Sequence, residues 1–400
     1  MGAWFSYPGA MPKRLIVGLL LLAALPATAA EPSRARLRDL GVTIGTMTPG
    51  KYNAITDVPG VKVGQVTLVR GDGKMTPGKG PVRTGVTAIV PRDDVWRKKV
   101  HAASFALNGN GEVTGTHWIN EAGWLETPIL LTDTLSVGKV SDAVVTWMGG
   151  RFPKMGDGDD VVLPVVAECD DSFLNDQQGR HVSTADVIRA IDGATSGPVA
   201  EGAVGAGTGM VAFRFKGGIG TASRKLSKEE GGYTVGVLVN CNMGTREDLR
   251  IDGVPVGREI TDLMPRYKPS DGSIIVVVGT DAPALPHQLR RIAMRAAMGL
   301  ARTGTTARQS SGDFMLAFST ATVVPHGPDA LTMPITALHN DAINPLFQAT
   351  IEATEEAIGN ALTSATTTVG RDGNTAYALP LDRLKTVMKK YGRLKEPVAR

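Results

Sequence analysis

Five consecutive β-branched residues, Ile274-Ile275-Val276-Val277-Val278, constrain the fold of this chain more than any other segment. A strand with no polar position is expected to be buried on both faces, so its sheet needs a covering layer on each side. The strand follows the polar turn Asp271-Gly272-Ser273, which puts Ser273 where a buried strand meets solvent. Taken alone, this turn is an ordinary loop signal. The same residues would also suit a chain that cuts itself at Gly272-Ser273 and then uses the new amino-terminal serine as a nucleophile.

The composition is that of a globular protein and excludes some function classes. Of the 400 residues, 20% are charged and 42% hydrophobic, and the 48 glycines indicate many tight turns and close backbone contacts. The length leaves the number of domains open between one and two. The formal net charge of +4 is made of interspersed charges, so no nucleic-acid partner is expected.

The first thirty residues have the pattern of a secretory signal. Lys13-Arg14 precede an apolar run from Leu15 to Leu25, and small residues follow up to Ala30. The run is short for a membrane span, so we expect cleavage near Glu31 and no stable membrane anchor, with an uncleaved anchor as the alternative. The mature protein, residues 31–400, is therefore expected to be periplasmic or secreted.

Cysteine and histidine usage bears on disulfides and metals. In an oxidising compartment Cys169 and Cys241 could pair, although two cysteines alone decide nothing. The six histidines are scattered, and no C-x-x-C or H-E-x-x-H spacing occurs. No metal site is expected.

Periodicity predicts strands and helices in mixed order. Ser183 and Asp186 form a capping-box pattern that begins one helix, and Pro164 favours an edge position, a strand start or a bulge for the strand that contains it. Because strands and helices do not alternate strictly, we expect a layered α/β fold with mixed sheets. The predicted strands are 61–68, 86–90, 161–167, 233–239, 274–278 and 315–318, and the predicted helices are 183–193, 285–300, 344–362 and 381–391.

Two glycine-rich segments are interpreted differently: residues 108–112 as backbone geometry, and residues 193–220 as either backbone packing or a close ligand. Residues 108–112 only superficially resemble a nucleotide loop, because no full G-x-G-x-x-G follows and residues 113–116 do not open a periodic helix. Residues 193–220 are dense in glycine, which indicates tight backbone packing or a close ligand.

Ordered segments along most of the chain carry a resemblance to a known family. The chain resembles the serine amino-terminal-nucleophile aminopeptidases of the DmpA/BapA type, which comprise L-aminopeptidase/D-esterase and β-peptidyl aminopeptidases. Only the signal and parts of the loops lie outside the resemblance. The matching segments are 53–60, 108–112, 205–210, 216–222, 246–257, Asp271-Gly272-Ser273 and Ser311-Gly312-Asp313.

The resemblance implies a four-layer αββα sandwich made as one precursor. In such a family the chain cleaves itself at Gly272-Ser273, here into residues 31–272 and 273–400, and no cofactor is used. A serine hydroxyl is a weak nucleophile, and cleavage frees the Ser273 α-amine, whose ordinary pKa of about 7.7–8.0 makes it a base near neutral pH. The implied substrates are small peptides, amino-acid amides or esters. The implied assembly is a homo-oligomer, a tetramer of processed protomers.

The resemblance also assigns roles to four further residues. Ser311 and Asp313, two positions apart on an extended segment, would position and tune Ser273, although the same residues read as a polar turn before a strand. Asn242 would stabilise the oxyanion, or would be a turn residue after a strand. Glu168 would receive the free amino group of the substrate, or would be a solvated strand end.

One position departs from the family pattern. Where an aromatic residue is expected two positions after Glu168, this chain has Asp170, and its negative charge would favour amino groups or basic side chains. Strand alternation adds a second inference: if Glu168 and Asn242 both face the site, Cys169 and Cys241 both face away from it, either paired or as free buried thiols.

Two other functions stay open at this point. Acyl transfer is one, because ornithine acetyltransferases resemble this family in fold and self-cleavage, but they use threonine where this chain has Ser273. An inactive periplasmic binding protein on the same scaffold is the other. The choice among L-α, D-α and β amino-terminal residues is also open.

Overall fold

Two stacked β-sheets form the centre of the molecule. The computed structural model describes residues 33–266 and 272–395, and from Arg34 onward the chain forms one compact unit. The predicted signal segment 1–30 and Asp271 lie outside the described residues. The larger sheet has six strands, in the spatial order β4 (Trp124–Leu125), β3 (Lys98–Gly109), β12 (Gly312–Pro325), β11 (Gly272–Thr280), β10 (Thr234–Met243) and β9 (Gly218–Lys225).

The smaller sheet has four strands and faces the larger one. In it β5 and β6 run parallel, as β11 and β12 do in the larger sheet, while the other pairs within the two sheets are antiparallel. The predicted mixed sheets are therefore confirmed. The spatial order is β1 (Lys62–Arg70), β2 (Val82–Val90), β5 (Ile129–Asp133) and β6 (Val165–Cys169).

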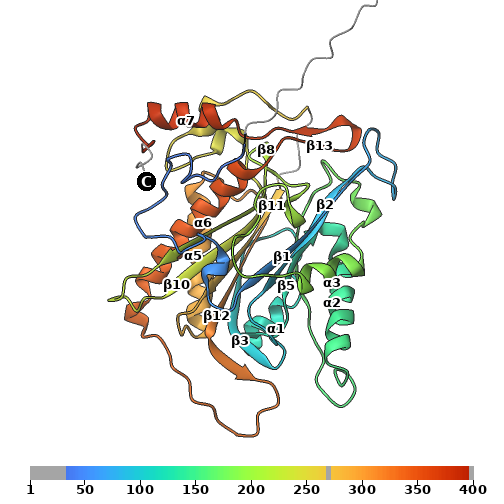
Figure 1. Cartoon of the computed structure of the whole chain (residues 1–400), viewed down its shortest axis with the longest axis vertical. Coiled ribbons are helices and arrows are strands. Elements are labelled where there is room, and N and C mark those ends of the chain that lie inside the picture. Colours follow the sequence, from blue (N-terminus) through green and yellow to red (C-terminus); the bar gives the residue numbers. More distant parts are fainter. Residues whose placement is uncertain (1–32, 267–271, 396–400) are drawn as a thin grey trace, which may run out of the picture. The chain divides into compact units, whose positions relative to one another are not determined.

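Helices cover the outer face of each sheet (Figure 1). α5 (Pro286–Arg302) and α6 (Asn344–Ser364) pack on the six-stranded sheet, and α2 (Val137–Arg151) and α3 (Thr184–Asp192) pack on the four-stranded one. The layer order is helix, sheet, sheet, helix, as predicted. Besides short 3-10 helices, the smaller elements are α1 (Thr116–Ala122), α4 (Val256–Glu259), α7 (Leu381–Lys390) and the strand pairs β7 (Val211–Ala212) with β8 (Phe215–Lys216) and β13 (Thr368–Val369) with β14 (Thr375–Ala376).

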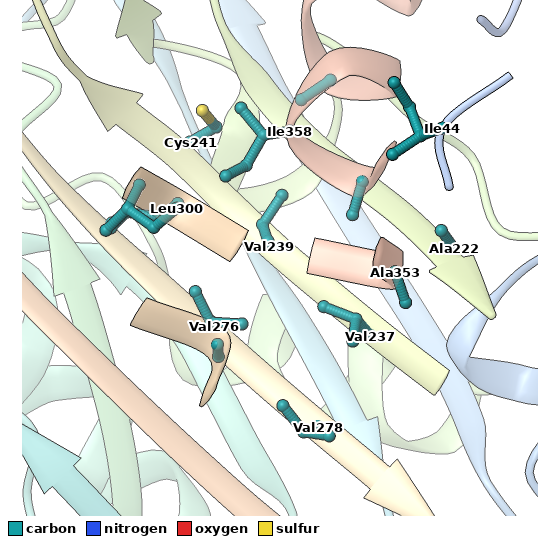
Figure 2. Packing of buried hydrophobic residues seen from close by; sticks show 14 of the residues in the cluster. Ile44, Ala222, Val237, Val239, Cys241, Val276, Val278, Leu300, Ala353 and Ile358 are labelled. Carbon is teal, nitrogen blue, oxygen red and sulfur yellow. The ribbon is translucent and has the colours of Figure 1, made fainter. Parts of the chain in front are cut away.

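The apolar strand β11 is buried on both faces, as its sequence predicts. Ile274, Val276 and Val278 pack toward α5 and α6, whereas Ile275 and Val277 enter the core between the sheets. Burial of each such side chain contributes about 1.5–3 kcal/mol before entropy is counted, so β11 anchors both layers. Figure 2 shows part of the helix-side cluster, with residues of β10 and β11 against α5 and α6.

Local signals account for several element boundaries. Ser183 caps α3 and forms the predicted capping box with Asp186. β6 is an edge strand of the four-stranded sheet. It begins at Val165, directly after Pro164, which has no N–H to donate to a ladder. The predicted strand start at Val161 was therefore wrong.

Three helices were missed: α1, α2 and α4. α1 begins at Thr116, although residues 113–116 were expected not to open a helix. It has seven residues between Gly115 and Gly123, both in the left-handed conformation, and buries Ile119, so it shows no apolar repeat.

In the part of the chain that the structure describes, no helix is both long and apolar enough to cross a membrane.

Candidate active site

Ser273 lies at the start of β11, between two neighbouring strands. It pairs with Asn242 on antiparallel β10 and with Gly312 on parallel β12, and only 6% of its surface is exposed. The backbone N–H of Gly312 donates to Ser273 Oγ at 3.3 Å. The hydroxyl is therefore held at the end of the sheet, with β10 on one side and β12 on the other.

Gly272, the residue before Ser273, has no room for a side chain. Its φ is +74°, and a Cβ there would overlap the carbonyl oxygen of Asn242. Both requirements restrict the position to glycine. The Gly272–Ser273 peptide bond lies at the first residues of β11.

Asn242 lies directly across from Ser273, and directly opposed residues of an antiparallel pair project to the same face. Its Oδ1 accepts from the Val211 N–H at 2.7 Å, and its Nδ2 donates to the Asp170 carbonyl oxygen at 2.8 Å. If the amide were flipped, its nitrogen would face the Val211 N–H and its oxygen would face the Asp170 carbonyl oxygen, so neither hydrogen bond could form. The two contacts together therefore fix the orientation of the amide. An amide nitrogen carries two N–H groups, and the bond to Asp170 uses one of them.

Ser311 and Asp313 are joined to each other next to Ser273. The Ser311 hydroxyl donates to Asp313 Oδ1 at 2.8 Å, and Asn108 Nδ2 donates to Asp313 Oδ2 at 3.0 Å. Burial raises the pKa of the Asp313 carboxyl, and the hydrogen bonds from Ser311 and Asn108 offset part of that rise. Gly312 lies between these residues and contacts Ser273, so the structure brings Ser273, Ser311 and Asp313 into one neighbourhood.

Glu168 lies at the end of β6 in the facing sheet and is 2% exposed. Its Oε1 accepts from the Glu112 N–H at 3.0 Å, and its Oε2 accepts from the Thr134 hydroxyl. Burial is the main cause that raises the pKa of Glu168, and the charges of Asp170 and Asp133 add to the rise. Thus Glu168 is not the solvated strand end that its position in the sequence also allowed.

The loop 110–112 connects the surroundings of Glu168 with those of Ser311. Asn110 Nδ2 donates to the Ser310 carbonyl oxygen at 2.7 Å, and a Cβ at Gly111 would lie 2.7 Å from Glu168 Oε1. The same Cβ would lie 3.1 Å from the Phe314 ring. The loop therefore packs against the Glu168 carboxylate and the Phe314 ring, and its glycine is needed for close packing rather than for phosphate binding.

Asp170 is half-buried and takes part in the site through its backbone. Its carbonyl oxygen receives Asn242 Nδ2, while its carboxylate accepts from the Ser172 N–H at 2.8 Å and from Gln177 Nε2 at 3.2 Å. These contacts give the Asp170 carboxylate one preferred orientation. Its negative charge raises the pKa of Glu168.

Comparison with protein families identifies the chain. The model of peptidase family S58 matches residues 53–376, which is most of the chain. This chain belongs to peptidase family S58.

Relatives of this S58 peptidase are similar over nearly their whole length. The β-peptidyl aminopeptidase BapA of Sphingosinicella microcystinivorans is 46% identical over 395 residues, covering 95% of this chain and 97% of BapA. A Burkholderia sp. β-aminopeptidase structure has a TM-score of 0.82 at 46% identity, covering 90% of this chain and 99% of that chain. The L-aminopeptidase D-Ala-esterase/amidase of Ochrobactrum anthropi, a prototype serine aminopeptidase, has a TM-score of 0.84 at 42% identity with coverages of 90% and 99%.

These similarities confirm the predicted fold and the enzyme class. The Ochrobactrum structure is a variant of the Ntn hydrolase fold, and the αββα layers of this S58 peptidase match it. The chain is an aminopeptidase of the serine, Ntn-type class.

The two cysteines of the S58 peptidase do not pair. Both are free and buried. Cys241 packs among the helix-side residues of the larger sheet (Figure 2), whereas Cys169 enters the core between the sheets. The inference that both cysteines face away from the site was wrong for Cys169. Neighbouring residues of a strand point to opposite faces, so Glu168 projects from the face of β6 opposite to Cys169, where it bonds to Thr134 and to the Glu112 N–H.

Sequence reasoning missed the residues that hold the predicted ones in place. Thr134 follows β5 with no motif around it, and Asn108 lies in a segment interpreted only as backbone geometry. Asn108 had a usable signal, since an amide at a strand end beside a glycine loop commonly bonds to a neighbouring strand.

Proposed function

We propose that this S58 aminopeptidase is made as a precursor that cleaves itself between Gly272 and Ser273 and then uses Ser273 as its nucleophile. The observation that carries the proposal is the position of Ser273: a buried hydroxyl beside Asn242 and the Ser311–Asp313 pair, preceded by a glycine that tolerates no side chain. The matched relatives support the same class of chemistry.

Self-cleavage follows from the chemistry of a serine after a peptide bond. Ser273 Oγ attacks the Gly272 carbonyl carbon, and its proton passes to the Ser273 nitrogen as the C–N bond breaks. The resulting ester is hydrolysed by water, which leaves a carboxylate on Gly272 and a free α-amine on Ser273. The amide nitrogen cannot act as a base, whereas the amine can, so cleavage creates the general base.

Peptide hydrolysis then proceeds through an acyl-enzyme on Ser273. The α-amine accepts the Oγ proton as Oγ attacks the substrate carbonyl, and the proton is passed to the leaving amine. The carbonyl oxygen becomes negative in the tetrahedral intermediate, where Asn242 Nδ2 is the proposed donor. The Ser311–Asp313 pair holds the amine in the correct orientation, and water releases the acyl group.

Glu168 is the proposed receptor for the amino group of the substrate. An ionised carboxylate held by the Glu112 N–H and Thr134 has a fixed direction, and a substrate ammonium would compensate its burial. Requiring a free amino terminus makes the enzyme an aminopeptidase. Small peptides, amides and esters are the proposed substrates, and the names of the relatives favour β-amino residues at the amino terminus.

Export and assembly complete the proposal. The segment 1–30 would direct the chain to the periplasm or outside the cell, and processed protomers would form a homo-oligomer, with a tetramer as the expected state. Neither nucleic acid nor a cofactor has a role in this scheme.

A panel of p-nitroanilides tests the substrate class. Purified enzyme is assayed with L-α, D-α and β-amino acid p-nitroanilides and with the amino-acetylated form of the best substrate. We expect turnover only with a free amino group, and fastest with β-residues. Equal turnover of the acetylated compound would contradict the role of Glu168.

A further inference from the structure

Lys216 on β8 is a buried cation whose partners are all backbone carbonyls in the described structure. It is 0% exposed, and its Nζ donates to the oxygens of Gly207 at 2.9 Å, Met210 at 2.7 Å and Gly217 at 2.8 Å. Three bonds use all three ammonium hydrogens. Burying an ammonium group is costly even when it is hydrogen-bonded, and burial lowers the pKa of Lys216 to about 7.

The Met210–Val211 peptide links this cation to Asn242. Its carbonyl oxygen accepts from Lys216 Nζ at 2.7 Å, and its N–H donates to Asn242 Oδ1 at 2.7 Å. The amide of Asn242 then donates through Nδ2. The ammonium, the peptide and the side-chain amide are thus arranged head to tail, each polarised by the one before it.

The hairpin that carries Lys216 is fixed to β10. Val211 and Lys216 are register partners in the β7–β8 pair, and the two turn residues, Phe213 and Arg214, both have positive φ. The Phe213 N–H donates to the Met243 carbonyl oxygen at 2.7 Å, one residue after Asn242. Consecutive non-glycine residues at positive φ are strained, so this hairpin is held by its surroundings.

We propose that Lys216 is a positioning residue for the reaction, acting through the Met210–Val211 peptide to orient and polarise the Asn242 amide toward the developing oxyanion. The inference rests on the proposed function. Hydrogen bonds in a chain strengthen one another by about 10–30% per bond, and loss of one oxyanion donor costs roughly 10²–10³ in kcat, so loss of the polarising cation should cost part of that factor.

A double-mutant cycle tests the coupling. Lys216→Met removes the ammonium and keeps an apolar chain of similar length, and Asn242→Ala removes the donor. Rates are measured with the best p-nitroanilide and divided by the amount of processed chain. We expect Lys216→Met to lower kcat about 10-fold with KM within about twofold, and to have no further effect in the Asn242→Ala background.

Two outcomes overturn the inference: a wild-type kcat in Lys216→Met, or the same fold-loss in both backgrounds, which would make Lys216 a purely structural residue. If the methionine variant does not fold, Lys216→Gln, which keeps a neutral donor, replaces it in the same cycle. If the variants process slowly, the rate of precursor cleavage replaces kcat. An inactive wild-type enzyme would instead overturn the proposed function, so the two failures are distinguishable.

Discussion

A side chain at Gly272 would occupy the position of the Asn242 carbonyl oxygen. The residue before the proposed nucleophile is therefore pressed against the strand that carries the proposed oxyanion donor, at a φ of +74°. This contact ties the geometry of the Gly272–Ser273 bond to the position of β10.

Replacing Gly272 by alanine should block processing. We expect Gly272→Ala to accumulate as a full-length chain with activity lowered at least about 10²-fold, because the bond can no longer sit against β10 in its native conformation. Gly253→Ala is the matched control, since Gly253 has a φ of +75° with nothing within 4 Å of its Cβ position. Equal processing of both variants on a denaturing gel would contradict the steric account.

Asp313 should affect turnover more than substrate binding. Asp313→Asn removes the charge that orients the Ser311 hydroxyl and Asn108, and we expect kcat to fall roughly 10²-fold, the lower range for loss of acid–base assistance, with KM little changed. Steady-state kinetics on processed enzyme is the measurement, with exposed Asp329→Asn as the control. A raised KM at unchanged kcat would assign Asp313 to substrate binding instead.

Thr134 should set the pH at which the amine site fails. Only ionised Glu168 binds an ammonium group, so binding is lost as the pH falls through the pKa of Glu168 in the folded enzyme. Burial raises that pKa and the Thr134 hydrogen bond lowers it. Thr134→Val should therefore raise the pKa further and move the loss of binding to higher pH.

The pH dependence of Ki for an amino alcohol that lacks a scissile bond measures this shift. An inhibitor is preferred to kcat/KM, because titration of the Ser273 α-amine would overlap the rate profile. Exposed Thr386→Val should leave the Ki profile unchanged. An unchanged profile in Thr134→Val would mean that Glu168 is not the amine receptor.

Asp170 should contribute to selectivity for charge. Asp170→Asn keeps the backbone bond to Asn242 and an acceptor for Ser172, but removes a negative charge near Glu168. We expect kcat/KM for aminoacyl amides with basic side chains to fall several-fold more than for neutral ones, as a surface or half-buried charge pair is worth about 1 kcal/mol or less. Equal losses on both classes would count against a role in selectivity.

Local signals predicted several elements of the layers, and the family resemblance implied their αββα order. The apolar run in β11, the capping box at Ser183 and the proline that begins α6 each depend on a few neighbouring residues. α1 was missed because a short helix between two glycines has no periodicity to detect. α2 was missed although its buried Val140, Val144 and Met148 recur at helical spacing.

The candidate site residues were proposed only through the family resemblance, and their roles stay predictions. Ser273, Asn242 and Glu168 come from three strands of two sheets, and no spacing rule relates them. Alternation along one strand does not say which face of that strand meets the other sheet, which is why the cysteine inference failed. Thr134 and Lys216 act through contacts that only the folded chain creates.

Intact-mass spectrometry of the wild type and Ser273→Ala tests the central claim most directly. The account predicts two chains from the wild type, the smaller one beginning at Ser273, and a single inactive chain from Ser273→Ala. A wild-type enzyme that is active as one uncut chain would contradict it.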